Sequence, residues 1–167
     1  KICGAGFGAQ IAAYDPMLPP QDIEADGATT MDLHQLLAWS DVISIHVPLT
    51  EETRGLIGAP QLALMRQGAV IVNTSRGGII DEPALAAALA NGRIGGAGID
   101  VFEFEPPHAE NPLFAVPNVV LAPHVAGVTE ASMKDMALAC ANVIETILAG
   151  DRPATLLNPE IWPEVVK

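Results

Sequence analysis

The sequence predicts an α/β fold with a doubly wound parallel sheet. Short apolar segments rich in valine and isoleucine alternate with longer segments whose apolar residues have helical spacing. Residues 69–72 are apolar at every position, which is typical of a strand buried on both faces of a parallel sheet. The polar residues Asn73 to Arg76 follow directly, at the carboxyl end of the strand, where α/β folds bind ligands.

Composition restricts the domain organisation and the partners. Of the 167 residues, 50% are hydrophobic and 17% are charged, which suits one globular domain or one domain plus part of another. The formal net charge of −12 repels phosphate backbones and anionic membrane surfaces, so we expect neither nucleic acid nor a membrane as a partner. The two cysteines, Cys3 and Cys140, make no disulfide framework, and we expect a cytoplasmic protein. Because the first residue is Lys1, we expect the sequence to be part of a longer one.

The first residues contain a glycine pattern that invites a dinucleotide-binding interpretation. Residues 4–9 match G-x-G-x-x-A, but that motif needs a whole helix before the acid of the second strand, about 20 residues on. Only 11 positions separate Gly4 from Asp15. We therefore predict that residues 3–8 are the last turn and C-cap of a helix. The first strand and the glycine loop are then missing from this sequence.

The rest of the sequence alternates strands and helices. The predicted strands are residues 10–14, 42–45, 69–72, 96–101 and 119–122. The predicted helices are residues 31–39, 59–67, 84–91 and 129–149. The last of these ranges includes its N-cap residue. Thr30, Asp81 and Thr129 are the expected N-caps, and Gly68, Gly92 and Gly150 are the expected stops. The loop 103–117 is too long for a simple connection and is predicted to be functional.

The last predicted helix carries an apolar stripe at helical spacing. We expect this stripe to be part of the core or of a subunit interface rather than a cofactor site. Its members are Met133, Met136, Ala137, Cys140, Ile144, Ile147 and Leu148.

A charged or titratable residue follows each predicted strand, and a single parallel sheet would bring all of them to one edge. They are Asp15, His46, Arg76, Asp100 and His124. Taken singly, Arg76 has the ordinary interpretation of a solvated loop residue, and Asp15 that of a turn residue before Pro16. As a ligand-binding residue, Asp15 would accept hydrogen bonds from an adenosine ribose and repel a 2′-phosphate, which favours NAD over NADP.

His124, in the segment 123–127, is the candidate for proton transfer near neutral pH. A histidine does this when a carboxylate orients it and stabilises its charged form, and Glu105 is the candidate carboxylate. His34, on a predicted helix, is expected to be structural, and His108 is expected to be solvated.

Three segments together resemble the signature segments of the D-isomer-specific 2-hydroxyacid dehydrogenases. They are Asn73-Thr-Ser-Arg-Gly-Gly78, Gly98-Ile-Asp-Val-Phe-Glu-Phe-Glu-Pro106 and Pro123-His-Val-Ala-Gly127, in the family's order and spacing. Arg76 and Glu105 are 29 positions apart, and Glu105 and His124 are 19 apart. Smaller matches at residues 14–16, 40–48 and Thr53 extend the resemblance over nearly the whole sequence.

The resemblance implies a Rossmann-type NAD-binding domain that interconverts a 2-keto acid and a D-2-hydroxy acid, in a homodimer. Arg76 would bind the carboxylate and carbonyl of the substrate, and His124 would exchange a proton with the carbonyl oxygen. Glu105 would hold His124 and raise its proton affinity. The residues implied to contact NAD are Asp15, Pro16, His46, Val47, Pro48, Thr53, Thr74, Ser75, Arg76, Asp100, His124 and Gly127.

Two parts of the family pattern are missing, namely the glycine loop that holds the pyrophosphate and the amino-terminal substrate domain. We therefore expect residues 1–127 to be an incomplete NAD-binding domain. Residues 128–167 would be a crossover helix and a tail that returns toward the absent substrate domain. The fragment alone is not expected to turn over substrate.

Other functions fit less well. A non-catalytic NAD-binding regulator on the same scaffold is the main alternative, although a pure sensor does not need Arg76, Glu105 and His124. A short-chain dehydrogenase would place lysine four positions after its tyrosine, but Leu18 stands there after Tyr14. Formate dehydrogenases of the same family would have glutamine in place of Glu105. The sequence lacks G-x-S-x-G of serine hydrolases and any His and Cys spacing typical of metal sites.

Overall fold

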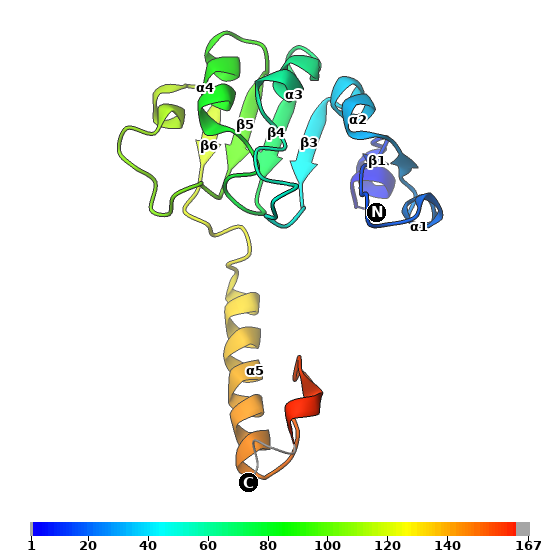
Figure 1. Cartoon of the computed structure of the whole chain (residues 1–167), viewed down its shortest axis with the longest axis vertical. Coiled ribbons are helices and arrows are strands. Elements are labelled where there is room, and N and C mark those ends of the chain that lie inside the picture. The colour runs from blue at the N-terminus through cyan, green and yellow to red at the C-terminus, as the bar shows by residue number, and fades with distance from the viewer. Residues whose placement is uncertain (1, 163–167) are drawn as a thin grey trace. The chain divides into compact units, whose positions relative to one another are not determined.

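The structure, a computed structural model, describes residues 2–162. Its strands are β1 (Ala12–Ala13), β2 (Thr29–Thr30), β3 (Val42–Ile45), β4 (Val70–Asn73), β5 (Gly96–Ile99) and β6 (Val119–Leu121). Its α-helices are α1 (Pro20–Ala25), α2 (Leu33–Trp39), α3 (Ala59–Leu64), α4 (Glu82–Ala90) and α5 (Glu130–Leu148) (Figure 1). Shorter helical segments are the π-helical η1 (Ile2–Gly6) and the 3-10 helices η2 (Pro112–Ala115) and η3 (Pro159–Ile161). The chain separates into two compact units, residues 1–126 and 127–167.

The strands of the first unit form two parallel sheets. β3, β4, β5 and β6 pair in that order, with Val70 opposite both Val42 and Gly96. β1 pairs with β2 in a separate two-stranded sheet. The α/β class with parallel strands is thus confirmed. The strands lie in two sheets because within residues 2–162 no strand lies between β1 and β3, where this fold has its first strand.

The hydrophobic core of the first unit lies between the four-stranded sheet and the helices α2, α3 and α4. On the sheet side, Ile43 and Ile71 are buried, and Leu37, Leu62 and Leu85 of the three helices are buried against them. Each buried leucine stabilises the fold by about 1.5–3 kcal/mol. This packing fixes the strands, and with them the loops that follow their carboxyl ends.

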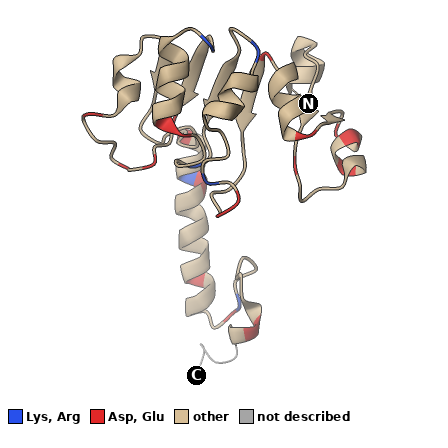
Figure 2. Ribbon diagram, turned by 45° about the horizontal axis from the view of Figure 1, so that its top comes forward, with Lys and Arg blue, Asp and Glu red and all other residues tan. Residues whose placement is uncertain are grey.

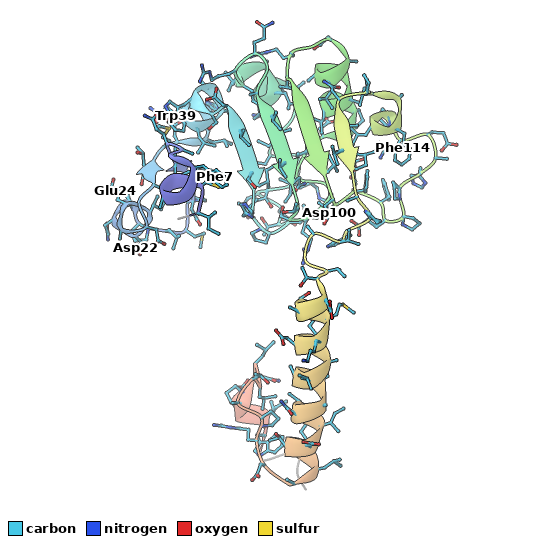
Figure 3. All side chains as sticks on the ribbon, turned by 180° about the vertical axis from the view of Figure 1, so that it is seen from behind. Phe7, Asp22, Glu24, Trp39, Asp100 and Phe114 are labelled. Atoms are coloured by element: carbon cyan, nitrogen blue, oxygen red, sulfur yellow. The ribbon has the colours of Figure 1, made fainter. Side chains whose placement is uncertain are left out.

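The opposite face of the four-stranded sheet is covered only in part. Val42 and Val120 are 64% and 74% exposed, and Val70 and Val72 are half-buried. α3 and α4 lie in front of the strands in Figure 1, and the reverse view in Figure 3 shows the strands with no helix of this unit over them. The prediction that residues 69–72 are buried on both faces is therefore wrong for the second face, because both connecting helices pack on the first.

Two predicted helix ends are also wrong. α2 begins at Leu33, because Asp32 rather than Thr30 is the N-cap. The Asp32 carboxylate accepts the Gln35 N–H at 2.8 Å, and the Gln35 side chain accepts the Asp32 N–H, which makes a capping box. α3 ends at Leu64, three residues before the predicted Gln67, and Gly68 then turns the chain into β4 with a φ of +80°. The sequence did not indicate α1 or β2.

Other predicted ends are confirmed. The Asp81 carboxylate caps α4 by accepting the Ala84 N–H at 2.9 Å, and the Thr129 hydroxyl caps α5. η1 forms the predicted helical turn near the start, and Gly8 ends it with a φ of +67°. The G-x-G-x-x-A match is therefore the end of a helix and not a phosphate-binding loop.

The apolar stripe of α5 is not part of a core within its own unit. No residue of α5 is buried, and Met133, Met136 and Ile144 are each more than half exposed. Its interpretation as a subunit interface stays a prediction. Residues 163–167 of the predicted tail lie outside the described residues.

Candidate active site

The carboxyl edge of the four-stranded sheet carries four of the five predicted strand-end residues. His46, Arg76, Asp100 and His124 follow β3, β4, β5 and β6, which run parallel. Figure 3 labels Asp100 at this edge. Asp15 follows β1 and lies at the end of the other sheet, so the prediction that all five share one edge is wrong for Asp15. The cause is the same missing strand between the two sheets.

Asn73 organises the loop that follows β4. Its side chain is 2% exposed; Oδ1 accepts the Ser75 N–H at 3.0 Å and the Ser75 hydroxyl at 2.8 Å. Its Nδ2 donates to the Arg76 carbonyl at 2.9 Å. These bonds hold the backbone on both sides of Arg76 while the Arg76 side chain stays exposed. The guanidinium donates one hydrogen bond, to the Ser75 carbonyl at 2.7 Å.

Gly77 brings this loop into contact with the loop that follows β5. A Cβ at Gly77 would overlap the Phe102 carbonyl and would lie 2.6 Å from the Glu103 nitrogen, so a side chain there would force the two backbones apart. Gly78 turns the chain with a φ of +77°, whereas Gly77 is needed for the close approach.

Glu105 and His124 form the central contact of the site. The Glu105 Oε2 atom lies 2.9 Å from His124 Nδ1, and Glu105 Oε1 accepts the Phe102 N–H at 3.1 Å. The hydrogen bond with His124 lowers the pKa of the Glu105 carboxyl, and the Phe102 N–H lowers it further. The side chain of His124 is 47% exposed and that of Glu105 is 40% exposed. The ring therefore reaches solvent while Nδ1 is engaged.

Asp100 holds the backbone of the loop that carries His124. It is 5% exposed, and its two carboxylate oxygens accept the N–H groups of Val125 and Ala126 at 2.8 Å each. The Asp100 carbonyl accepts the His124 N–H at 2.8 Å. His124 has a φ of +57°, a conformation that costs a residue with a side chain about 1–2 kcal/mol. Such strain persists where neighbouring bonds fix it, and it is concentrated at functional sites.

Four of the residues that the resemblance implies to contact NAD lie in a compact loop after β3, namely His46, Val47, Pro48 and Thr53. The Thr53 hydroxyl donates to the Pro48 carbonyl at 2.6 Å and accepts the Thr50 N–H at 2.8 Å. Val47 packs against the core, and His46 shares a 2.8 Å hydrogen bond with Ser44.

The remaining predicted cofactor residues lie in different surroundings. Asp15 accepts the Met17 N–H at 2.8 Å, which is the turn interpretation of this residue, and Pro16 is exposed beside it. Thr74 is exposed and Ser75 is half-buried in the loop after β4. Gly127 belongs to the second unit and has open space around the position of a Cβ.

The charges around the site are sparse. Eight Lys and Arg residues face twenty Asp and Glu in the whole chain, and Figure 2 shows the basic residues as isolated points. Within residues 2–162 no group of three or more His, Cys, Asp or Glu is arranged to hold a metal ion. In the same part of the chain, no helix combines the length and apolarity that crossing a membrane requires.

Comparison with known proteins places this chain in a family. Residues 2–126 match the model of the D-isomer specific 2-hydroxyacid dehydrogenase, NAD binding domain. Over 156 residues the chain is 44% identical to a glyoxylate reductase of Thermococcus litoralis, covering 93% of this chain and 47% of that protein. It is 42% identical over 159 residues to a D-3-phosphoglycerate dehydrogenase of Methanocaldococcus jannaschii, covering 95% of this chain and 30% of that protein.

A solved structure agrees with the sequence relatives. The D-lactate dehydrogenase of Lactobacillus jensenii with NAD+ has a TM-score of 0.82 and 30% identity, over 92% of this chain and 49% of that one. The chain thus spans half or less of the length of these proteins. With the family model covering most of its residues, the chain belongs to the D-isomer specific 2-hydroxyacid dehydrogenases, and residues 2–126 match their NAD-binding domain.

Proposed function

We propose that this chain supplies the cofactor-binding and proton-transfer half of an NAD(H)-dependent oxidoreductase that interconverts a 2-keto acid and a D-2-hydroxy acid. The observation that carries the proposal is the 2.9 Å contact between His124 Nδ1 and Glu105 Oε2, at the sheet edge where Arg76 is exposed. The names of the relatives, a glyoxylate reductase, a D-3-phosphoglycerate dehydrogenase and a D-lactate dehydrogenase, support the same class of reaction.

His124 is the proton-transfer residue in this proposal. With Nδ1 on Glu105, the Nε2 atom faces the ligand, donates a proton to the substrate carbonyl oxygen during reduction and accepts it back during oxidation. The Glu105 carboxylate stabilises the imidazolium and fixes the ring orientation. The lowered pKa of Glu105 keeps it charged at neutral pH, as this role requires.

Arg76 binds the carboxylate of the substrate. Its guanidinium is always charged, and its planar N–H groups match a carboxylate in a two-point contact. Only one of its hydrogen bonds is made within the described protein, to the Ser75 carbonyl, so donors remain for a ligand.

The polar residues of this chain fit part of an NAD(H) molecule. Half-buried Asp15 offers a carboxylate oxygen to ribose hydroxyl groups, and the loop of Thr74 and Ser75 lies beside the proton-transfer pair through the contact of Gly77 with Phe102. No glycine loop for the pyrophosphate is found within residues 2–162, because the glycine pattern of residues 4–9 ends a helix. When bound, NAD(H) supplies or accepts the hydride.

The experiment uses the full-length protein and follows NADH oxidation with glyoxylate, hydroxypyruvate and pyruvate. We expect turnover with at least one of these 2-keto acids, and faster turnover with NADH than with NADPH because Asp15 repels the 2′-phosphate. NADH binding without turnover of any 2-keto acid would contradict the proposal and favour a non-catalytic NAD-binding regulator.

We further propose that the full-length protein is a cytoplasmic homodimer, as the family resemblance implies. The exposed apolar stripe of α5 is compatible with a subunit contact, and the two exposed, free cysteines are compatible with a reducing compartment. Light scattering coupled to size exclusion measures the mass directly. A monomer at micromolar concentration would contradict the dimer.

A further inference from the structure

The loop that carries Glu105 is closed at both ends by one carboxylate that has no part in the proton transfer. Glu82 begins α4 and is half-buried. Its Oε1 accepts the Glu103 N–H at 2.7 Å, and its Oε2 accepts an Nδ2 hydrogen of Asn111 at 2.6 Å. The two partners lie 21 and 29 positions from Glu82, so neither contact comes from local helix geometry.

The first of these contacts lies next to the site. Glu103 is two residues before Glu105, and its nitrogen is the atom that a Cβ at Gly77 would approach to 2.6 Å. The Glu103 side chain also lies 3.7 Å from Arg54. A shift of the Glu103 backbone therefore moves Glu105 relative to His124.

The second contact fixes the far end of the loop. Asn111 uses its whole side chain, because Oδ1 caps η2 by accepting the Leu113 N–H at 3.0 Å while Nδ2 donates to Glu82. Leu113 is fully buried and anchors η2 in the core. The segment 103–111 is thus tied at one end through Glu103, at the other through Asn111, and to α4 at both.

We infer that Glu82 is a positioning residue, which holds the loop 103–111 so that Glu105 stays within hydrogen-bond distance of His124. The inference rests on the proposed roles of Glu105 and His124. It predicts that loss of the Glu82 carboxylate disturbs the Glu105–His124 pair although Glu82 touches neither side chain.

The test measures the Glu105 pKa by carboxyl 13C NMR, together with kcat and KM, in the full-length protein. Glu82→Gln keeps the size of the side chain but replaces one acceptor oxygen with a donor. We expect the Glu105 pKa to rise toward its ordinary value, and kcat to fall about tenfold with a smaller change in KM. Glu110→Gln, an exposed acid in the same loop, is the matched control and is expected to change neither quantity.

A second variant tests the same inference in case Glu82→Gln does not fold. Asn111→Asp keeps the oxygen that caps η2 but places a carboxylate against Glu82, so it opens the contact between Asn111 and Glu82 without altering α4. We expect the same rise in the Glu105 pKa and the same fall in kcat.

The outcomes separate this inference from the proposed function. An unchanged Glu105 pKa and kcat in both variants, with only a lower thermal stability, would overturn the positioning role while leaving the reaction intact. If the unaltered protein binds NADH but turns over no 2-keto acid, the proposed function fails, and the NMR titration still decides whether Glu82 holds the loop.

Discussion

The two edges of the four-stranded sheet have two features in common. Each has a glycine in close contact with a neighbouring backbone and an arginine near that glycine, but the two arginines differ in how many of their hydrogen-bond donors are used. At the carboxyl edge, Gly77 contacts Phe102, and the Arg76 guanidinium bonds only to Ser75 within the described chain. At the amino edge, a Cβ at Gly95 would overlap the Gly68 carbonyl, and Arg93 is half-buried.

The difference lies in where the hydrogen-bond donors go. The Arg93 guanidinium donates to the carbonyls of Ala63 and Met65 at the end of α3, and Asn118 donates to the Gly95 carbonyl at 3.1 Å. Those donors are used to hold connections together. At the carboxyl edge, by contrast, the Arg76 guanidinium keeps N–H donors that its bond to Ser75 does not use, and the contact of His124 with Glu105 involves Nδ1 and not Nε2. The same local motif is thus structural where its hydrogen-bond donors are satisfied internally, and it keeps donors available for a ligand where they are not.

Removal of the imidazole at the carboxyl edge is expected to have the largest effect. Asparagine tolerates positive φ, so His124→Asn removes the proposed proton-transfer group without adding backbone strain at φ +57°. We expect kcat of the full-length enzyme to fall about 10³-fold with the fold intact by circular dichroism. His34→Asn on the exposed face of α2 serves as control. Retention of most of the activity in His124→Asn would contradict its role.

Replacement of each arginine by lysine tests the role of each sheet edge separately. Arg76→Lys keeps the charge but loses the planar fork, so we expect kcat/KM to fall about 10²-fold with little loss of stability. Arg93→Lys should leave kcat/KM unchanged and lower the free energy of unfolding by about 1–2 kcal/mol, because bonds to the two carbonyls are lost. Steady-state kinetics and urea unfolding measure the two quantities. Equal effects of both variants would remove the distinction between the edges.

The two close-approach glycines give a third contrast. Gly77→Ala and Gly95→Ala each place a methyl group against a backbone carbonyl and should each lower the free energy of unfolding by roughly 1–3 kcal/mol. Gly77→Ala should also reduce kcat, since it separates the loop of Arg76 from that of Glu105. Gly95→Ala should leave the kinetics of the folded protein unchanged, which active-site-normalised rates would reveal.

The pH dependence of stability is the smallest expected effect. Because the folded protein lowers the pKa of Glu105, the carboxylate contributes stability that is present above the ordinary pKa of glutamate and is lost as the pH falls through the lowered pKa. Glu105→Gln should therefore be less stable than the unaltered protein at neutral pH, and the difference should vanish in acid. We expect less than about 1 kcal/mol, because the pair is half-exposed. Urea unfolding at several pH values measures this; a difference that grows in acid would contradict it.

Short-range patterns in the sequence were enough to identify β1, the strands β3 to β6 and the helices α2 to α5, but not α1 or β2. Apolar periodicity located the strands β3, β4, β5 and β6, and the polar residues that follow them identified the edge where the candidate site lies. Asp81 and Thr129 were recognisable as caps, because capping depends on residues within one helical turn. The resemblance of three segments pointed to Glu105 as the partner of His124, and the structure has these two side chains in contact.

Contacts between distant segments were decided only by the tertiary structure. Three of these contacts join residues more than ten positions apart: Gly77 with Phe102, Asp100 with the loop of His124, and Glu82 with the loop 103–111. The pairing of the strands in two separate sheets is likewise a property of the tertiary structure. The sequence alone does not show whether a given glycine, aspartate or glutamate turns the chain, caps a helix or binds a remote loop. Which of these it does depends on the backbone that packing of the core brings beside it.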